Sequence, residues 1–220
     1  LDIPVETAHL GMVFPFSIEL SGQYVKNTLE SAWNEYQKSK ALASSELVFS
    51  YNWIWAVGRL ATICFYLGQP ARGYEVLNQA PKSIGPFMAP NEHYGEKYGP
   101  FLPWFTSGAG AFVYAINAMF VQVIDEQGAI LLPAVPDDIG QASFKNLSAD
   151  SGISVSGKIG AGKLLELIAH SMNERRSSFR MKEKIAEKVT FADGWTRSEL
   201  DATGMITVSG NLKKGEHDLI

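Results

Sequence analysis

The chain has 220 residues, of which 46% are hydrophobic and 19% charged, enough apolar surface for one large core or two smaller ones. A formal net charge of -4, with no basic run longer than the pair Arg175-Arg176, excludes an extended surface for a nucleic-acid backbone. The single cysteine, Cys64, lies in an apolar stretch, which excludes a disulfide framework and indicates a core position. The first residues form no basic and apolar leader, so we expect no export signal in this sequence.

The first two helical segments differ in how much of their surface is apolar. Residues 22–43 repeat apolar side chains near the helical period and carry charges elsewhere, which predicts a helix with one solvated side. Residues 47–67 are apolar almost all round, with Arg59 as the one charge, and Gly68 follows where a helix C-cap is expected. We therefore expect the second helix to be covered on most sides.

A helical hairpin and a long connection follow. Pro70 stands at a first-turn position of a short helix over 70–79, so residues 47–79 are expected to form two neighbouring helices. Five prolines and three glycines between Pro81 and Phe105 argue against a regular helix there. A connection of about 25 residues inside a compact domain is uncommon and usually functional.

A second segment that is apolar on all sides runs from Gly108 to about Asp125. Its length approaches that of a membrane span, but polar residues interrupt it and no basic or aromatic flank frames it, so we expect no membrane crossing. Helices that need partners on every side are most simply placed in the inner ring of a double-layered helical toroid. The chain has too few helical segments to close such a ring alone.

After Gln127-Gly128 the pattern changes to short runs typical of strands, punctuated by Gly, Asn and Asp. The expected strands are Ala129–Leu132, Gly152–Ile159, Lys163–His170, Ser178–Met181, Lys188–Phe191 and Met205–Ser209. Their spacing predicts an antiparallel β-sandwich. We therefore predict an α+β protein of two domains, with the last helices of a toroid over residues 1–128 and a β-sandwich over 129–220.

Two motifs in the middle of the chain carry a family resemblance. A leucine-leucine-proline-alanine-x-proline run is followed by a glycine-rich turn and a strand that begins glycine-lysine-leucine. The matching residues are Leu131, Leu132, Pro133, Ala134, Pro136, Gly162, Lys163 and Leu164. This order resembles the link between the catalytic barrel and the C-terminal β-domain of family 95 glycoside hydrolases, the α-L-fucosidase and galactosidase group. Residues 103–120 resemble the last inner helix of that barrel, and also a helix start in the family 65 phosphorylases.

The resemblance covers roughly residues 100–171 and implies a fold and an activity. The fold is an (α/α)6 six-hairpin toroid with an appended β-sandwich. The activity is hydrolysis of glycosidic bonds in oligo- or polysaccharides with inversion at the anomeric carbon, in a secreted or periplasmic enzyme. The remainder of the barrel would come from a longer chain or from self-association.

The chain departs from the family at one position. In the fucosidase-like enzymes, an aspartate near a proline-phenylalanine run helps to activate the attacking water, and aligning Pro100-Phe101 on that run places Trp104 at the aspartate's position. Family 65 enzymes hold phosphate near the corresponding helix start, where this chain has Thr106 and Ser107. A helix N-terminus with hydroxyls is a candidate anion site, and capping of the helix by Ser107 is the alternative.

Glycoside hydrolysis requires one carboxylic acid to protonate the leaving oxygen and one carboxylate to activate water or attack the sugar. The acids of the Pro/Gly-rich connection are Glu92 and Glu96, with His93 and Tyr94 between them. Glu92 is the candidate catalytic acid, because aromatic neighbours could desolvate it and raise its pKa. A solvated loop carboxylate is the alternative.

The candidate substrate-binding residues are His93, Trp104, Thr106 and Ser107. A sugar stacks its apolar face on an aromatic ring while polar groups fix its hydroxyls, and Trp104 stands at the mouth of the apolar helix. We expect no cofactor and no metal, because the sequence has no nucleotide-binding glycine loop and no metal-ligand spacing. The rival hypothesis is a non-catalytic carbohydrate-binding or scaffold protein of the same architecture, which Trp104 in place of the aspartate supports.

Overall fold

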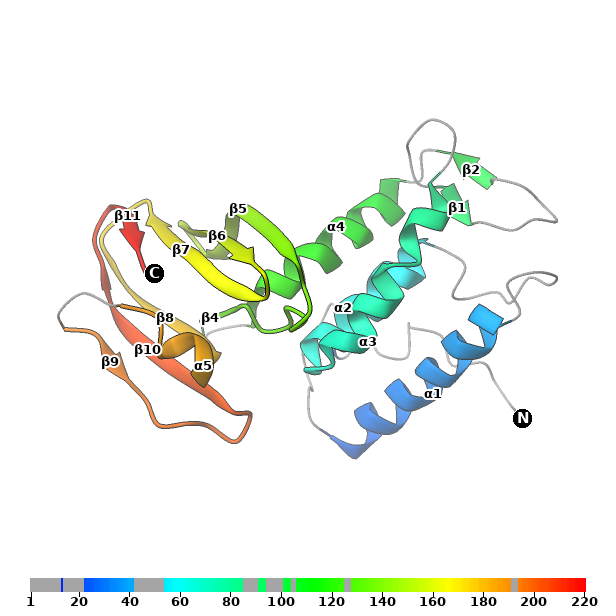
Figure 1. Cartoon of the computed structure of the whole chain (residues 1–220), viewed down its shortest axis with the longest axis horizontal. Coiled ribbons are helices and arrows are strands. Elements are labelled where there is room, and N and C mark those ends of the chain that lie inside the picture. The colour runs from blue at the N-terminus through cyan, green and yellow to red at the C-terminus, as the bar shows by residue number, and fades with distance from the viewer. Residues whose placement is uncertain are drawn as a thin grey trace. The chain divides into compact units, whose positions relative to one another are not determined.

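A computed structural model describes residue 13 and residues 22–41, 54–84, 91–93, 101–103, 106–124, 128–190 and 194–220. The chain divides into two compact units, residues 1–118 and 119–220. Figure 1 shows helices predominating in the first unit and strands in the second, so the protein is of the α+β class. Within the described ranges, no helix is both long and apolar enough to cross a membrane.

The first unit contains α1 (Gln23–Ala41), α2 (Ile54–Tyr66), α3 (Pro70–Leu77), the 3-10 helix η2 (Ala80–Ser83) and the start of α4 (Thr106–Phe120). All of α2 is buried except Trp55 and Arg59, in agreement with its apolar sequence. Gly68 adopts φ +69° just after α2, where a left-handed residue ends a helix at little cost. The predicted helix over 47–67 is described from Ile54 onward, and its first seven residues lie outside the described ranges.

Helices α2 and α3 form the expected hairpin. A Cβ atom added at Gly73 of α3 would stand 2.3 Å from the ring of Phe65, so α3 approaches α2 as closely as a glycine permits. Helix α1 is tied to α3 by polar contacts. The guanidinium of Arg72 donates to both oxygens of Glu30 at 2.5 and 3.0 Å and lies 4.8 Å from the Trp33 ring centroid. This pairing lowers the pKa of the Glu30 carboxyl.

Helix α4 packs on α2 at a glycine. A Cβ at Gly58 would stand 2.6 Å from the backbone carbon of Ala111, which leaves no room for a side chain at this crossing. Nearer the C-terminal ends of the two helices, the hydroxyls of Tyr66 and Tyr114 are 2.9 Å apart. Burial, followed by this hydrogen bond, raises the pKa of Tyr66 above its usual value.

The second unit contains two sheets and a short helix, α5 (Glu183–Ala186). The five-stranded sheet has the order β3 (Val121–Val123), β4 (Ala129–Leu131), β8 (Arg175–Lys182), β10 (Met205–Leu212) and β9 (Thr196–Arg197). The four-stranded sheet has the order β11 (Gly215–Asp218), β7 (Lys163–Ser171), β6 (Ile153–Gly160) and β5 (Gln141–Asp150). The described strand pairs are antiparallel except β4–β8, which is parallel.

Each sheet buries alternate side chains. The buried residues include Ile153, Val155 and Ile159 on β6, Phe179 and Met181 on β8, and Ile206, Val208 and Leu212 on β10. Figure 1 shows the sheets as separate layers of the second unit. One buried face on each of two layers is the pattern of a sandwich.

Several segments differ from expectation. The helix predicted to reach Asp125 ends at Phe120, and residues 121–123 pair with β4 instead, with Val121 opposite Leu131. The strand predicted over 188–191 is wrong for residues 188–190, which follow α5 in a turn and irregular backbone. Strand β5 was not predicted at all.

The boundary between the two compact units falls between Ala118 and Met119, whereas the sequence pattern changes near residue 128. The boundary lies before residue 128 because the last turn of α4 and strand β3 pack with the β-rich part. The ring centroids of Phe120 and Phe144, for example, are 4.8 Å apart. The assignment of these parts as the end of a toroid and a sandwich domain stays a prediction.

Candidate functional site

The candidate site in the first unit lies at a small antiparallel pair of strands. Strand β1 (Asn91–His93) pairs with β2 (Phe101–Pro103), with His93 opposite Phe101. Helix α2 contacts β1. The backbone of Glu92 and His93 therefore lies beside the strand that leads, two residues later, into α4.

The structure describes the predicted site residues only in part. Thr106 and Ser107 are the first two residues of α4, and both are exposed. Trp104 and the side chains of Glu92 and His93 lie outside the described residues. The catalytic role of Glu92 and the sugar contacts of the other four residues stay predictions.

Helix α4 presents an apolar stripe to the surface. Val113 is 54% exposed and Tyr114 43% exposed, and the space beside Gly110 is open. These positions recur at helical spacing from Thr106, so they share one side of the helix. We refer to Gly110, Val113 and Tyr114 as the α4 stripe.

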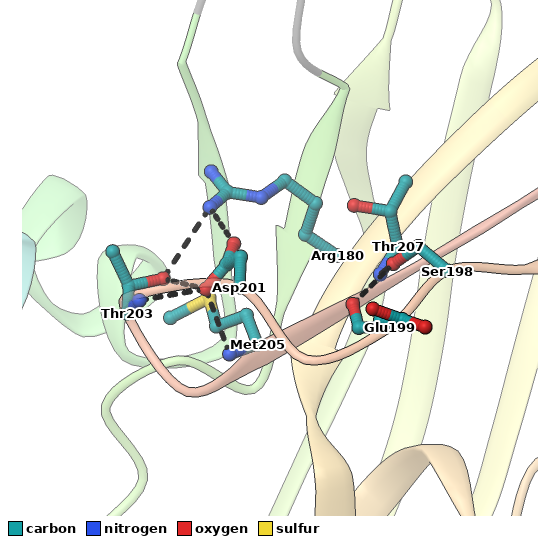
Figure 2. Close-up of polar contacts among 7 residues, drawn as sticks. All are labelled: Arg180, Ser198, Glu199, Asp201, Thr203, Met205 and Thr207. Atoms are coloured by element: carbon teal, nitrogen blue, oxygen red, sulfur yellow. Dashed lines mark hydrogen bonds and ion pairs between the residues drawn. The ribbon is translucent and has the colours of Figure 1, made fainter.

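The carboxylate of Asp201 lies in the loop between β9 and β10 and is held by several donors, as Figure 2 shows. It accepts hydrogen bonds from the hydroxyl of Thr203 at 2.5 Å, its N–H at 2.8 Å, Arg180 at 2.7 Å and the N–H of Met205 at 3.0 Å. The Thr203 hydroxyl first, and then Arg180, hold the pKa of Asp201 well below its usual range. A carboxylate so fully bonded stays ionised and is unsuited to donate a proton, so Asp201 fixes the loop.

Ser198 stabilises the same loop at the end that follows β9. Its hydroxyl accepts the N–H of Thr207 at 3.0 Å and donates to the Glu199 carbonyl at 2.8 Å (Figure 2). The sequence carries a signal for the Asp201 arrangement, since an aspartate two residues before a threonine in a loop is typical of an Asx turn.

The leucine-leucine-proline-alanine-x-proline run has a structural role here. Leu132 donates its N–H to the carbonyl of Phe120 at 2.6 Å, and Ala134 donates to the carbonyl of Met119 at 3.3 Å. These carbonyls belong to the last turn of α4, whose oxygens have no partner within the helix. Asp137, after the run, pairs with Lys184 at 2.7 Å and is exposed.

A cavity of about 310 Å³ opens in the second unit. Strands β3, β5, β8 and β10 and the residue before β4 supply its lining, which consists of Val123, Gly128, Ala149, Asp150, Arg176, Ser177, Ser178 and Ser209. Sequence reasoning missed this cavity because its residues come from five distant segments, and no spacing along the chain marks them. Over the described ranges, no three His, Cys, Asp or Glu residues gather as metal ligands.

No family model and no curated protein matches this sequence. Among solved structures, the chain has a loose similarity of fold to Ara127N-Se, a GH127 β-L-arabinofuranosidase from Geobacillus stearothermophilus T6. The TM-score is 0.37 and the sequence identity 11%, over 96% of this chain and 40% of that enzyme. The chain thus spans less than half of the length of that enzyme.

Proposed function

We propose that this chain is part of a glycoside hydrolase that acts on oligo- or polysaccharides with inversion. In this proposal, residues 1–128 belong to the end of an (α/α)6 toroid and residues 129–220 form its β-sandwich. The observation that carries the proposal is the pairing of β1 with β2, which sets the backbone of Glu92 beside the strand that leads into α4. This pairing supports a single site that includes both Glu92 and the N-terminus of α4.

The roles follow from the chemistry. Glu92 would protonate the leaving oxygen, and a carboxylate outside this chain would activate water on the opposite face of the sugar. In an inverting enzyme, the two carboxyl groups stand about 6.5–9.5 Å apart, which leaves room for that water. Trp104 would stack on the sugar, and His93, Thr106 and Ser107 would hydrogen-bond its hydroxyls.

The α4 stripe supports a partner for the helical unit. Helix α2 is covered by its neighbours within this chain, whereas α4 exposes Val113 and Tyr114. Further helices of a barrel, in a longer chain or a second copy, would remove these side chains from water. The β unit would then serve as a stabilising domain.

The test is Glu92→Gln in the complete enzyme, with Glu96→Gln as the matched control from the same connection. We expect Glu92→Gln to lower turnover about 100-fold to 10,000-fold while substrate binding stays nearly intact, because the amide cannot donate the acid proton. Trp104→Ala should instead weaken binding. Turnover unchanged by Glu92→Gln on every glycoside cleaved would place the acid elsewhere in the barrel.

The second candidate function is a non-catalytic carbohydrate-binding or scaffold protein. Trp104 favours it, since an indole stands where the fucosidase-like enzymes have their aspartate. Calorimetry with oligosaccharides distinguishes the two: binding without any release of reducing sugar by the complete protein supports this second function. Measurable hydrolysis excludes it.

A further inference from the structure

We infer that the cavity of the second unit binds a small oxyanion, the phosphate or carboxylate group of a small ligand. The cavity measures about 310 Å³, at the lower end of the range for small-molecule sites. One cation, one carboxylate and three serines from β5, β8 and β10 line it, with Arg176 and Ser178 on one face of β8 and Ser177 on the buried face. Polar groups at a concave surface are what fix the orientation of a small ligand.

Arg176 provides the positive charge. Its two neighbouring arginines on β8 are engaged, because Arg175 pairs with Asp150 at 3.0 Å and Arg180 with Asp201 at 2.7 Å. Arg176 is exposed and makes no ion pair or side-chain hydrogen bond within the described part of the chain. A free guanidinium offers a planar fork of N–H donors that matches two oxygens of a phosphate or carboxylate.

The serines provide further donors. The hydroxyls of Ser178 and Ser209 are 3.0 Å apart across β8 and β10, and because only one of them donates to the other, one O–H is left for a ligand. Ser177 is 5% exposed, and its hydroxyl lacks a hydrogen-bond partner among the described residues. A buried unpaired hydroxyl is unfavourable, so an acceptor that comes within its reach on binding is stabilising.

Asp150 is the negative group in the lining, and its charge is already offset. It accepts a hydrogen bond from Arg175 at 3.0 Å and one from the N–H of Ser151 at 2.6 Å. Arg175 also donates to the carbonyl of Ser151, which holds the pair in place. The cavity therefore keeps the charge of Arg176 available to an anion, while Asp150 can accept a hydroxyl of the same ligand.

The experiment titrates inorganic phosphate into the full 220-residue chain at constant ionic strength, with chloride as the replaced anion. We expect saturable shifts of the amide NMR signals of Gly128, Ser177, Ser178 and Ser209. Arg176→Ala should weaken phosphate affinity about tenfold or more, as expected for the loss of hydrogen bonds between charged groups. Arg197→Ala, which removes the same charge from exposed β9 outside the cavity, should leave the affinity unchanged.

Two further arms complete the test. Ser177→Ala should weaken phosphate binding without lowering the melting temperature of the free protein, because the variant loses a hydroxyl that has no partner. Acetate that competes with phosphate identifies a carboxylate as an alternative group, and phosphate binding without such competition identifies a tetrahedral one. Shifts that do not saturate, or equal losses in Arg176→Ala and Arg197→Ala, overturn the inference.

Discussion

Cys64 shows what burial does to a single residue. Its side chain is inaccessible on α2, and burial raises the pKa of the thiol from 9.0 to about 12. Because the thiolate is the nucleophile, Cys64 is a core residue without reactive chemistry in the folded protein. The sequence predicted this position from its apolar surroundings.

We expect Cys64 to resist a disulfide reagent such as Ellman's reagent at pH 8 until the protein is unfolded. The same shift makes stability depend on alkaline pH. Below pH 9.0 the thiol is protonated in both states, but between 9.0 and about 12 only the unfolded thiol ionises, so the contribution to stability is lost.

Cys64→Ala serves as the control for this pH dependence. Burial also raises the pKa of Tyr36 and Tyr66, so the variant should retain part of the alkaline destabilisation and lose the part due to the thiol. Fast reaction of Cys64 in native protein, at the rate of the unfolded chain, would contradict its burial on α2.

The Asp201 loop could be predicted from the sequence. The cavity of the second unit could not. An Asx turn depends on Asp201 and Thr203, two positions apart, and such spacing is visible in the sequence. The cavity brings Val123 and Ser209 to one place through strand order alone. That order is set by tertiary pairing, which periodicity does not contain.

At the scale of elements, strong local patterns were predictive. Helices α1 and α3 and strands β6, β7, β8 and β10 lie within a few residues of their expected positions. In each case the spacing of apolar residues in the sequence, about 3.6 residues in the helices and 2 in the strands, matches the spacing of the buried side chains. The α2–α3 hairpin was predicted from Pro70 and Gly68, which act through backbone geometry alone.

The elements that differed from prediction have weak or contradictory patterns. Strand β5 buries Ala149 alone among its ten residues, so its sequence lacks an apolar alternation. Strand β11 is polar throughout. Strand β3 continues the apolar run of α4 without a glycine or proline, and its pairing with β4 ends the helix at Phe120.

The crossing of α2 and α4 yields a prediction with a matched control. Gly58→Ala should destabilise the protein by about 1–3 kcal/mol, because the added methyl would overlap the backbone of Ala111. Gly110→Ala, in open space on α4, should stabilise by about 0.5–1 kcal/mol through helix propensity. Chemical denaturation of the two variants measures both, and a stabilising Gly58→Ala would show that the helices do not approach at this point.

At the scale of the whole molecule, the exposed apolar residues lead to an expectation about association. We expect the isolated chain to self-associate or bind a hydrophobic dye, because the α4 stripe exposes Val113 and Tyr114. Val113→Lys should reduce association in sedimentation experiments. Leu165→Lys, at a 61% exposed position on β7, is the control and should change it little.

A cooperative melt of a monomer that binds no dye would contradict the toroid proposal, since the helices would then need no further partners. Association that persists in Val113→Lys but disappears in Leu165→Lys would assign the contact to the β unit instead. Both outcomes test the proposed barrel only. The oxyanion inference is tested separately by the phosphate titration.

The pairing of β11 with β7 has a consequence for synthesis on the ribosome. Residues 215–218 cover the edge of β7, and Leu219 then donates its N–H to the carbonyl of Leu167 at 2.8 Å. Until these late residues emerge, β7 has an unpaired edge on a sheet whose β5–β6–β7 meander can already have formed. An open edge on a nascent chain is a template for intermolecular pairing. Translational pausing just before residue 215 would therefore prolong the stage at which the edge of β7 is open to pairing with another chain.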